Sequence, residues 1–118
     1  KIHNHIPGCT VHLYDLDEEG RLYEEIGKSD IFTNATRVGM KPMDGQSLIR
    51  DTKVFRKGLV VSDVVYNPRT TKLLADAQAA GCKTVPGVGM LLWQGVEAFR
   101  LYTGLDMPVE EVRERYFA

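Results

Sequence analysis

The sequence predicts an α/β fold with a mainly parallel sheet flanked by helices. Segments rich in β-branched residues alternate with segments of helical periodicity along the chain. The strongest strand signal, residues 58–66, is a nearly continuous apolar run, which is typical of a central parallel strand covered on both faces. Parallel strands joined through helices need right-handed crossovers, so one sheet with connecting helices is the expected architecture.

The individual elements follow from local signals. Strands are predicted over residues 10–16, 30–34, 58–66 and 82–85, and helices over 21–26, 46–51, 72–80 and 87–102, with a last helix beginning at Pro108. Residues that typically end or cap helices and strands lie at these boundaries. Asn67-Pro68 ends the third strand because proline has no N–H to donate. Thr70 or Thr71 can cap the helix that follows, and Gly81 closes it.

Composition narrows the functional classes. The 118 residues suffice for one small domain, and the net charge of -1 gives no long-range attraction to nucleic acid or an anionic membrane. We see no apolar run of membrane-spanning length and no signal peptide, so a cytoplasmic protein is expected. Cys9 and Cys82 form no disulfide framework, and His3, His5 and His12 lack the thiols or carboxylates of a metal site.

The helix expected at residues 87–102 carries one polar side chain in an apolar band. Gln94 shares a face with four apolar residues, Met90, Leu91, Ala98 and Leu101. A second apolar stripe predicts that this helix packs on more than one side. A buried amide without a hydrogen bond costs about 1–3 kcal/mol. The partner of Gln94 is therefore either another group of the protein or a polar ligand in a cleft near the helix start.

Three segments follow predicted strands: residues 34–40, 64–67 and 87–94. In parallel sheets such segments meet at the carboxyl edge, where ligands bind. Asp15 and Asp17 also follow a predicted strand and suggest the acidic pocket of a receiver-like phosphoacceptor domain. A loop acid followed by a helix cap explains these two acids more simply.

Motifs in the same three segments resemble those of shikimate dehydrogenases, most closely the quinate/shikimate dehydrogenase branch. They are Asn34-Ala-Thr-x-x-Gly-Met40, Asp63-Val-Val-Tyr-Asn-Pro68 with Thr71-Lys-Leu-Leu74, and Gly87-x-Gly-Met-Leu-x-x-Gln-Gly95. The resemblance runs from about residue 11 to residue 117 and is specific because three spaced motifs agree in order. A lone Gly-x-Gly would carry little information.

The resemblance implies an incomplete Rossmann-like NAD(P)-binding domain. Residues 1–118 would be the C-terminal part of that domain with closing C-terminal helices, and the family's N-terminal substrate domain would be absent. The implied enzyme is an oxidoreductase that transfers hydride between NAD or NADP and 3-dehydroshikimate/shikimate, or quinate, in aromatic amino acid biosynthesis. Its partner is therefore a small-molecule substrate.

The resemblance also implies a set of site residues. Gln94 and Tyr66 would bind substrate. The cofactor would contact Thr36, Arg37, Val64, Val65, Tyr66, Asn67 and Gly87. No segment matches the family's catalytic Lys and Asp, and no Gly-x-Gly-x-x-Gly turn is found in this sequence. The chain alone is therefore expected to be inactive.

Two other functions remain open at this point. The chain could be a non-catalytic nucleotide-binding or regulatory α/β module, or the receiver-like domain suggested by Asp15 and Asp17. In the fragment interpretation, missing strands would leave an open sheet edge and uncovered apolar surface. Such edges pair with other chains, so self-association is expected.

Overall fold

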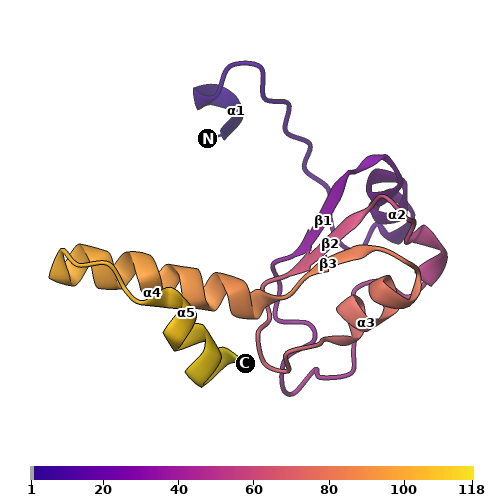
Figure 1. Ribbon diagram of the computed structural model, residues 1–118. Coiled ribbons are helices and arrows are strands. Elements are labelled where there is room, and N and C mark those ends of the chain that lie inside the picture. The colour runs from indigo at the N-terminus through magenta and orange to yellow at the C-terminus, as the bar shows by residue number, and fades with distance from the viewer. Residues whose placement is uncertain (1) are drawn as a thin grey trace.

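A three-stranded parallel sheet forms the centre of the computed structural model, which describes residues 2–118, with side chains from residue 4 onward. Its strands are β1 (Ile31–Asn34), β2 (Val60–Asp63) and β3 (Lys83–Val85), in the order β1-β2-β3 (Figure 1). The register pairs Ile31 with Val60 and Val60 with Lys83. The predicted α/β class, the parallel sheet and the central position of β2 are therefore confirmed.

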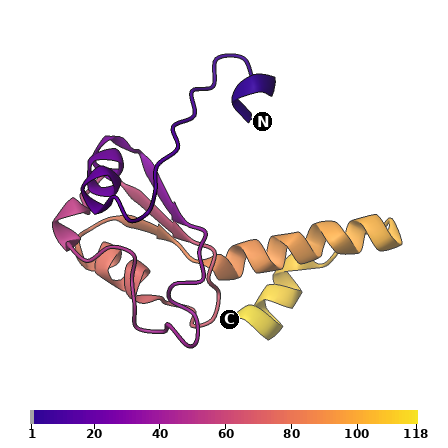
Figure 2. The same ribbon diagram turned by 180° about the vertical axis from the view of Figure 1, so that it is seen from behind.

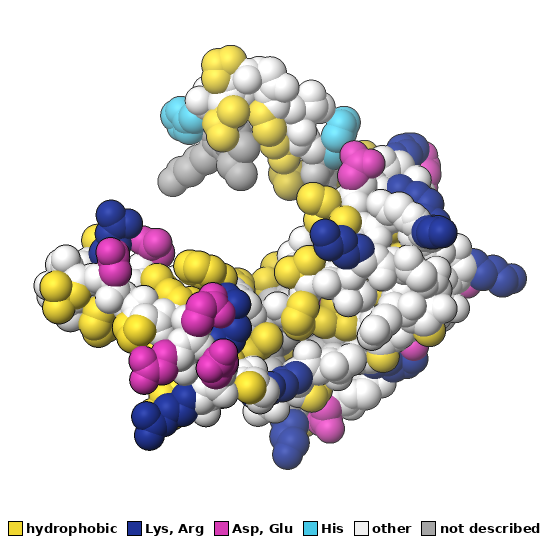
Figure 3. Space-filling view, viewed as in Figure 1, with side chains coloured by type: hydrophobic (Ala, Val, Ile, Leu, Met, Phe, Trp, Pro, Cys, Tyr) yellow, Lys and Arg dark blue, Asp and Glu magenta, His cyan; other side chains and the backbone are white. Residues whose placement is uncertain are grey.

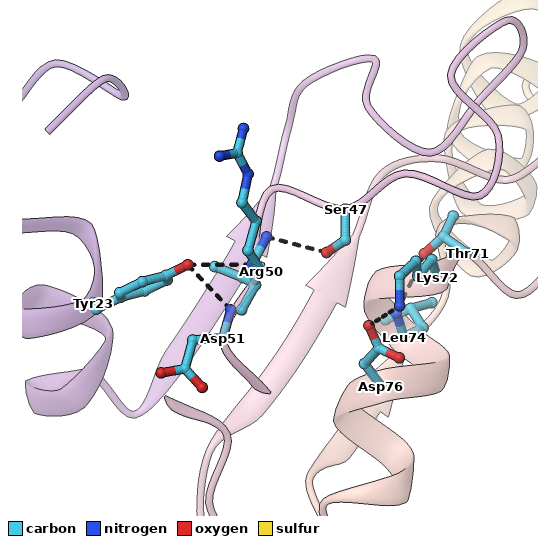
Figure 4. Close-up of polar contacts among 9 residues, drawn as sticks. Tyr23, Ser47, Arg50, Asp51, Thr71, Lys72, Leu74 and Asp76 are labelled. Carbon is cyan, nitrogen blue, oxygen red and sulfur yellow. Dashed lines mark hydrogen bonds and ion pairs between the residues drawn. The ribbon is translucent and has the colours of Figure 1, made fainter. Parts of the chain in front are cut away.

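The longer helices lie close to their predicted positions. They are α2 (Glu19–Lys28), α3 (Lys72–Ala79) and α4 (Gly87–Thr103), and the shorter helical segments are α1 (Ile2–His5), the 3₁₀ turn η1 (Thr52–Val54), α5 (Val109–Val112) and the π-helical turn η2 (Arg113–Phe117). Thr71 caps α3 by accepting the Leu74 N–H at 3.4 Å (Figure 4). Gly104, with φ of 71°, ends α4 in the left-handed conformation that suits glycine.

The core lies on one face of the sheet only. Helices α2 and α3 lie on the same side of the strands (Figures 1 and 2). The buried apolar side chains between them and the sheet are Ile26, Ile49, Phe55, Leu59, Val61, Leu73, Leu74, Ala77 and Cys82. On the opposite face Ile31 is 63% exposed, and Val60 is only partly buried. The expectation that residues 58–66 are covered on both faces is therefore wrong in this chain, because no described helix packs on that second face.

The strand predicted at residues 10–16 does not form, and the third predicted strand is shorter than expected. Residues 10–15 have no regular structure and pair with no described strand, residue 16 lies in a turn, and Leu13 is 89% exposed. This segment instead leads from α1 to the sheet body as an arm (Figure 1). The third strand is also shorter than predicted, ending at Asp63 and not at residue 66.

The predicted helix at 46–51 is replaced by an irregular loop that side chains hold in place. The Tyr23 hydroxyl accepts the backbone N–H groups of Arg50 and Asp51, each at 3.2 Å, and donates to Glu19 Oε1 at 2.7 Å. Ser47 Oγ accepts the next N–H upstream, that of residue 49, at 3.1 Å (Figure 4). These backbone donors are satisfied by side chains, so the segment needs no helical hydrogen bonds.

Helix α4 projects from the carboxyl end of β3 away from the sheet body (Figure 1). Only Gly87 and Leu92 of this helix are buried, and Trp93 and Leu101 are 52% and 83% exposed. The space-filling view shows apolar side chains along this helix (Figure 3). The prediction that α4 packs on more than one side is wrong within this chain, because the sheet reaches only its first turns and the C-terminal η2 covers a small part of the rest.

Candidate functional site

A buried polar network joins the carboxyl ends of β1 and β2 to the start of α3. Asn34, Asp63 and Thr71 are each 1–2% exposed. Asp63 Oδ1 accepts the Asn34 amide at 3.1 Å and the Val65 N–H at 3.0 Å, and Asp63 Oδ2 accepts the Thr71 hydroxyl at 2.7 Å. Every buried side-chain polar atom of the described residues has a hydrogen-bond partner. Such fully satisfied networks fix one geometry for the loops they join.

Asn34 extends this network into the loop after β1. Its Oδ1 accepts the Thr36 N–H at 3.0 Å and the Thr36 hydroxyl at 2.7 Å, while its Nδ2 donates to the Val38 carbonyl at 3.0 Å. The Thr36 Oγ1 in turn accepts the Val38 N–H at 3.2 Å. Residues 34–38 therefore form a turn whose shape is set by one buried amide.

The loops after β1 and β2 enclose a pocket of about 220 Å³. Its walls are Thr36, Met40, Lys41, Val64, Val65, Tyr66 and Asn67. Pockets that bury a whole drug-sized ligand have volumes of about 300–1,000 Å³. The pocket is therefore large enough for a single ring system with its substituents, and too small for an entire dinucleotide.

The chemistry of the walls suits a flat, partly polar ring. Val64, Val65 and Met40 provide apolar surface, and Tyr66 adds a half-exposed aromatic side chain. Thr36 and Asn67 add polar groups at the rim. Apolar surface with a few hydrogen-bonding groups is typical of pockets for small organic ligands.

Gly87 brings the start of α4 against the same pocket wall. A Cβ at this position would lie 2.5 Å from the Val64 carbonyl oxygen and 2.6 Å from that of Val65. These are backbone atoms, so the chain would have to shift to accept any side chain. The close approach explains why glycine stands here, and it fixes α4 relative to the β2 loop.

The structure gathers part of the predicted site. Five predicted cofactor residues, Thr36, Val64, Val65, Tyr66 and Asn67, line one pocket, and Gly87 packs behind two of them. Arg37 is exposed and does not line it. Their contacts to a cofactor stay a prediction.

Gln94 differs from its sequence-based description. Its side chain is exposed, on the second turn of α4, and is not part of the pocket wall. Among the described residues it forms no side-chain hydrogen bond. The expectation of a buried amide is wrong in this chain because α4 projects beyond the sheet. Its proposed contact with substrate is not tested by this geometry.

Sequence reasoning missed two wall residues and the role of Asp63. Met40 and Lys41 line the pocket because the loop after β1 folds back over it. Asp63 is an acid at the end of a strongly apolar strand, and that position was the signal that could have pointed to a buried functional group.

The described residues form none of the other site types considered. No group of three or more potential metal ligands occurs among residues 2–118 as described. None of the described helices has the length and apolar character required to cross a bilayer. Among the described residues, the hydrogen bond and charge interaction with Lys28 lower the pKa of Glu24, and the same hydrogen bond raises the pKa of Lys28. Both lie on α2, away from the pocket.

Comparison with known proteins assigns the chain to a family. The model of the shikimate 5'-dehydrogenase C-terminal domain matches residues 87–115. Quinate/shikimate dehydrogenase of Escherichia coli (strain SMS-3-5) is 50% identical over 106 residues, which is 90% of this chain and 37% of that protein. The chain belongs to the shikimate dehydrogenase family. The recognition made from the three motifs is thereby confirmed.

Solved structures of shikimate dehydrogenase relatives share the fold. Shikimate 5-dehydrogenase from Listeria monocytogenes, solved with shikimate and NAD, superposes with a TM-score of 0.88 at 46% identity, over 94% of this chain and 38% of that one. Quinate dehydrogenase from Corynebacterium glutamicum, solved with NAD, gives 0.77 at 38% identity, over 88% and 35%. The Rossmann-like class is therefore confirmed. This shikimate dehydrogenase family chain spans little more than a third of the length of these relatives.

Family membership removes the basis for the receiver-like interpretation. Asp15 and Asp17 lie exposed in the turn before α2, where Asp15 Oδ1 accepts the Asp17 N–H at 3.2 Å. The Asp15 carbonyl also accepts the Glu18 N–H at 3.1 Å. The simpler explanation, local turn acids before a helix, accounts for both residues.

Proposed function

We propose that residues 1–118 supply the C-terminal part of the dinucleotide-binding domain, with its closing helices, of an NAD(P)-dependent shikimate or quinate dehydrogenase. The bound nicotinamide would supply the hydride chemistry between cofactor and 3-dehydroshikimate/shikimate or quinate. The family's substrate domain, with its catalytic Lys and Asp, would be contributed by polypeptide outside this sequence. We further propose a place in aromatic amino acid biosynthesis and a cytoplasmic location, where the buried Cys82 thiol stays reduced.

The observation that carries this proposal is the pocket at the carboxyl ends of β1 and β2. In open α/β sheets, ligands bind outside this end of the strands. Val64, Val65, Tyr66 and Asn67 follow β2 directly and form one wall, and Thr36 faces them from the β1 loop. The pocket size suits the nicotinamide end of NAD or NADP. Relatives solved with NAD support this choice of ligand.

This chain's residues would act by orientation. The Asp63 and Asn34 hydrogen bonds hold the two loops at a fixed separation, so a ring would enter a preformed slot. Tyr66, at the rim and half exposed, would close the ring off from water and face the substrate. Gln94, on the exposed face of α4, would contribute hydrogen bonds to substrate hydroxyls.

The direct test is a chimera. The matched 106 residues of the E. coli quinate/shikimate dehydrogenase would be replaced by the corresponding residues of this chain. The account predicts NAD- or NADP-dependent oxidation of shikimate or quinate by the folded chimera, measured by absorbance of the reduced cofactor. A chimera that melts cooperatively and binds dinucleotide without turnover would support the alternative, a non-catalytic nucleotide-binding or regulatory module.

The same chimera tests Gln94. Gln94→Ala removes one or two hydrogen bonds to substrate, so kcat/KM for shikimate or quinate should fall about tenfold to a hundredfold while the KM of the cofactor stays unchanged. Glu97→Gln, one turn later on the same exposed helix, is the matched control and should leave both values unchanged. An unchanged kcat/KM for Gln94→Ala would remove it from the substrate site.

A further inference from the structure

The buried carboxylate of Asp63 is held by hydrogen bonds and by no ion pair among the described residues. Its side chain is 1% exposed, and its two oxygens accept hydrogen bonds from the Asn34 amide, the Val65 N–H and the Thr71 hydroxyl. Three donors and no acceptor match the ionised form. Within the part of the chain that the structure describes, Asp63 forms no ion pair.

This charge lies directly behind the pocket wall. Val65 lines the pocket, and its N–H donates to Asp63 Oδ1 at 3.0 Å. On the other side, Asn34 links Asp63 to Thr36, which also lines the pocket. Asp63 is thus one hydrogen bond from the β2 wall and two from the β1 wall, which places it within about 10 Å of a ring held there.

The two redox states of nicotinamide differ in charge and hardly in size. The oxidised ring carries one positive charge, and the reduced ring is neutral. We propose that the buried Asp63 carboxylate makes this pocket prefer the oxidised, cationic nicotinamide over the reduced, neutral one. This inference rests on the proposed function, because it assumes that the pocket holds the nicotinamide end of the cofactor.

One cation on the pocket wall opposes this effect only weakly. Lys41 is exposed and has no ion pair among the residues described, so its ammonium group stays hydrated at the end of a flexible stem. Exposed charges are screened by water and salt, whereas buried charges are screened much less. The Asp63 charge should therefore dominate, with an effect of about fivefold on the ratio of the two affinities at an effective dielectric between protein and water.

The test compares two forms of one ligand on the full 118-residue chain. Oxidised and reduced nicotinamide mononucleotide share the same ribose and phosphate, so the ratio of their Kd values isolates the ring charge. The Kd values come from chemical-shift titrations followed at Thr36, Val65 and Tyr66. The wild-type chain should bind the oxidised form more tightly, and Asp63→Asn should lower that preference about fivefold.

A control separates charge from shape. Thr71→Val removes one hydrogen bond to Asp63 and leaves the charge in place, so both Kd values should rise together with their ratio unchanged. If Asp63 had only a structural role, Asp63→Asn would also leave the ratio of the two Kd values unchanged. That result would overturn the inference.

A second measurement does not depend on the variant folding. The wild-type chain is titrated with 1-methylnicotinamide, which is cationic, and with nicotinamide, which is neutral. Tighter binding of the cation by a few-fold supports the inference, and equal binding overturns it while leaving the nicotinamide pocket intact. If none of the four compounds shifts the pocket resonances, the proposed function and the inference fail together.

Discussion

The sheet body, which is the sheet with α2 and α3, and helix α4 differ in how fully their apolar side chains are buried. In the body, Leu73 and Leu59 are almost fully buried, and the buried side-chain polar atoms are satisfied. Along α4 the apolar side chains of Trp93, Leu101 and Tyr102 are more than half exposed, although this helix is rich in apolar residues. An apolar sequence therefore indicates which side chains favour burial. The structure shows which of them this chain buries by itself.

The pocket and Gln94 lie in these two different regions. The pocket lies in the sheet body, where hydrogen bonds of Asp63 and Asn34 fix its two loops. Gln94 lies on α4 and is exposed to solvent. Ligand contacts made by the pocket should be measurable in this chain. Contacts made by Gln94 should appear only when another polypeptide covers α4.

The largest expected difference is in core truncation. Leu73→Ala, at a buried position of α3, should lower the free energy of unfolding by about 2–5 kcal/mol through lost burial and a residual cavity. Leu101→Ala, on exposed α4, should change it by less than about 0.5 kcal/mol. Urea unfolding of both variants at one protein concentration tests the contrast. Similar losses in the two variants would mean that α4 is covered in solution, as self-association would produce.

A smaller effect is expected where the two regions join. Gly87→Ala places a Cβ 2.5 Å from the Val64 carbonyl oxygen and should cost about 1–3 kcal/mol. Gly95→Ala is the matched control within the same helix, because its Cβ would meet nothing within 4 Å. It should instead stabilise the chain, by up to about 1 kcal/mol, through helix propensity. Thermal melts that rank the two variants the other way would contradict the described junction.

The smallest effect concerns the α2 surface. Lys28 Nζ lies 2.7 Å from Glu24 Oε1, and this contact lowers the pKa of Glu24 below its usual value. A lowered carboxyl pKa gives stability that is present above the unfolded pKa and is lost as the pH falls through the folded one. Both side chains are more than half exposed, so Glu24→Gln should leave the Tm at pH 7 nearly unchanged and remove only a slight dependence of stability on pH between about pH 5 and pH 3. A marked loss at pH 7 would be inconsistent with an exposed pair.

The sequence predicted those features that depend on local chemistry. Thr71 as a cap, Pro68 as a breaker and the apolar run of β2 act within a few residues, so the elements around them were found. The helix expected at 46–51 failed because the Tyr23 hydroxyl, distant in sequence, takes its backbone donors. The strand expected at 10–16 and the buried state of Gln94 failed because both assumed packing partners that the described residues do not provide.

The same distinction applies to the site. Five pocket residues were identified through family motifs, whose spacing preserves a strand end and its loop. Met40 and Lys41 depend on how the β1 loop folds over the pocket, which spacing alone does not determine. The hydrogen bonds of Asp63 likewise depend on the fold, because it brings β1, β2 and the start of α3 together.

The central claim is that the pocket after β1 and β2 holds a nicotinamide ring. The most direct measurement titrates the 118-residue chain with nicotinamide mononucleotide and, separately, with 5'-AMP, which also carries a ribose and a phosphate but no nicotinamide. The account predicts saturable chemical-shift changes at Thr36, Val65, Tyr66 and Asn67 with the first ligand and none at these residues with the second. Equal changes with both ligands, or changes confined to other parts of the chain, would contradict it.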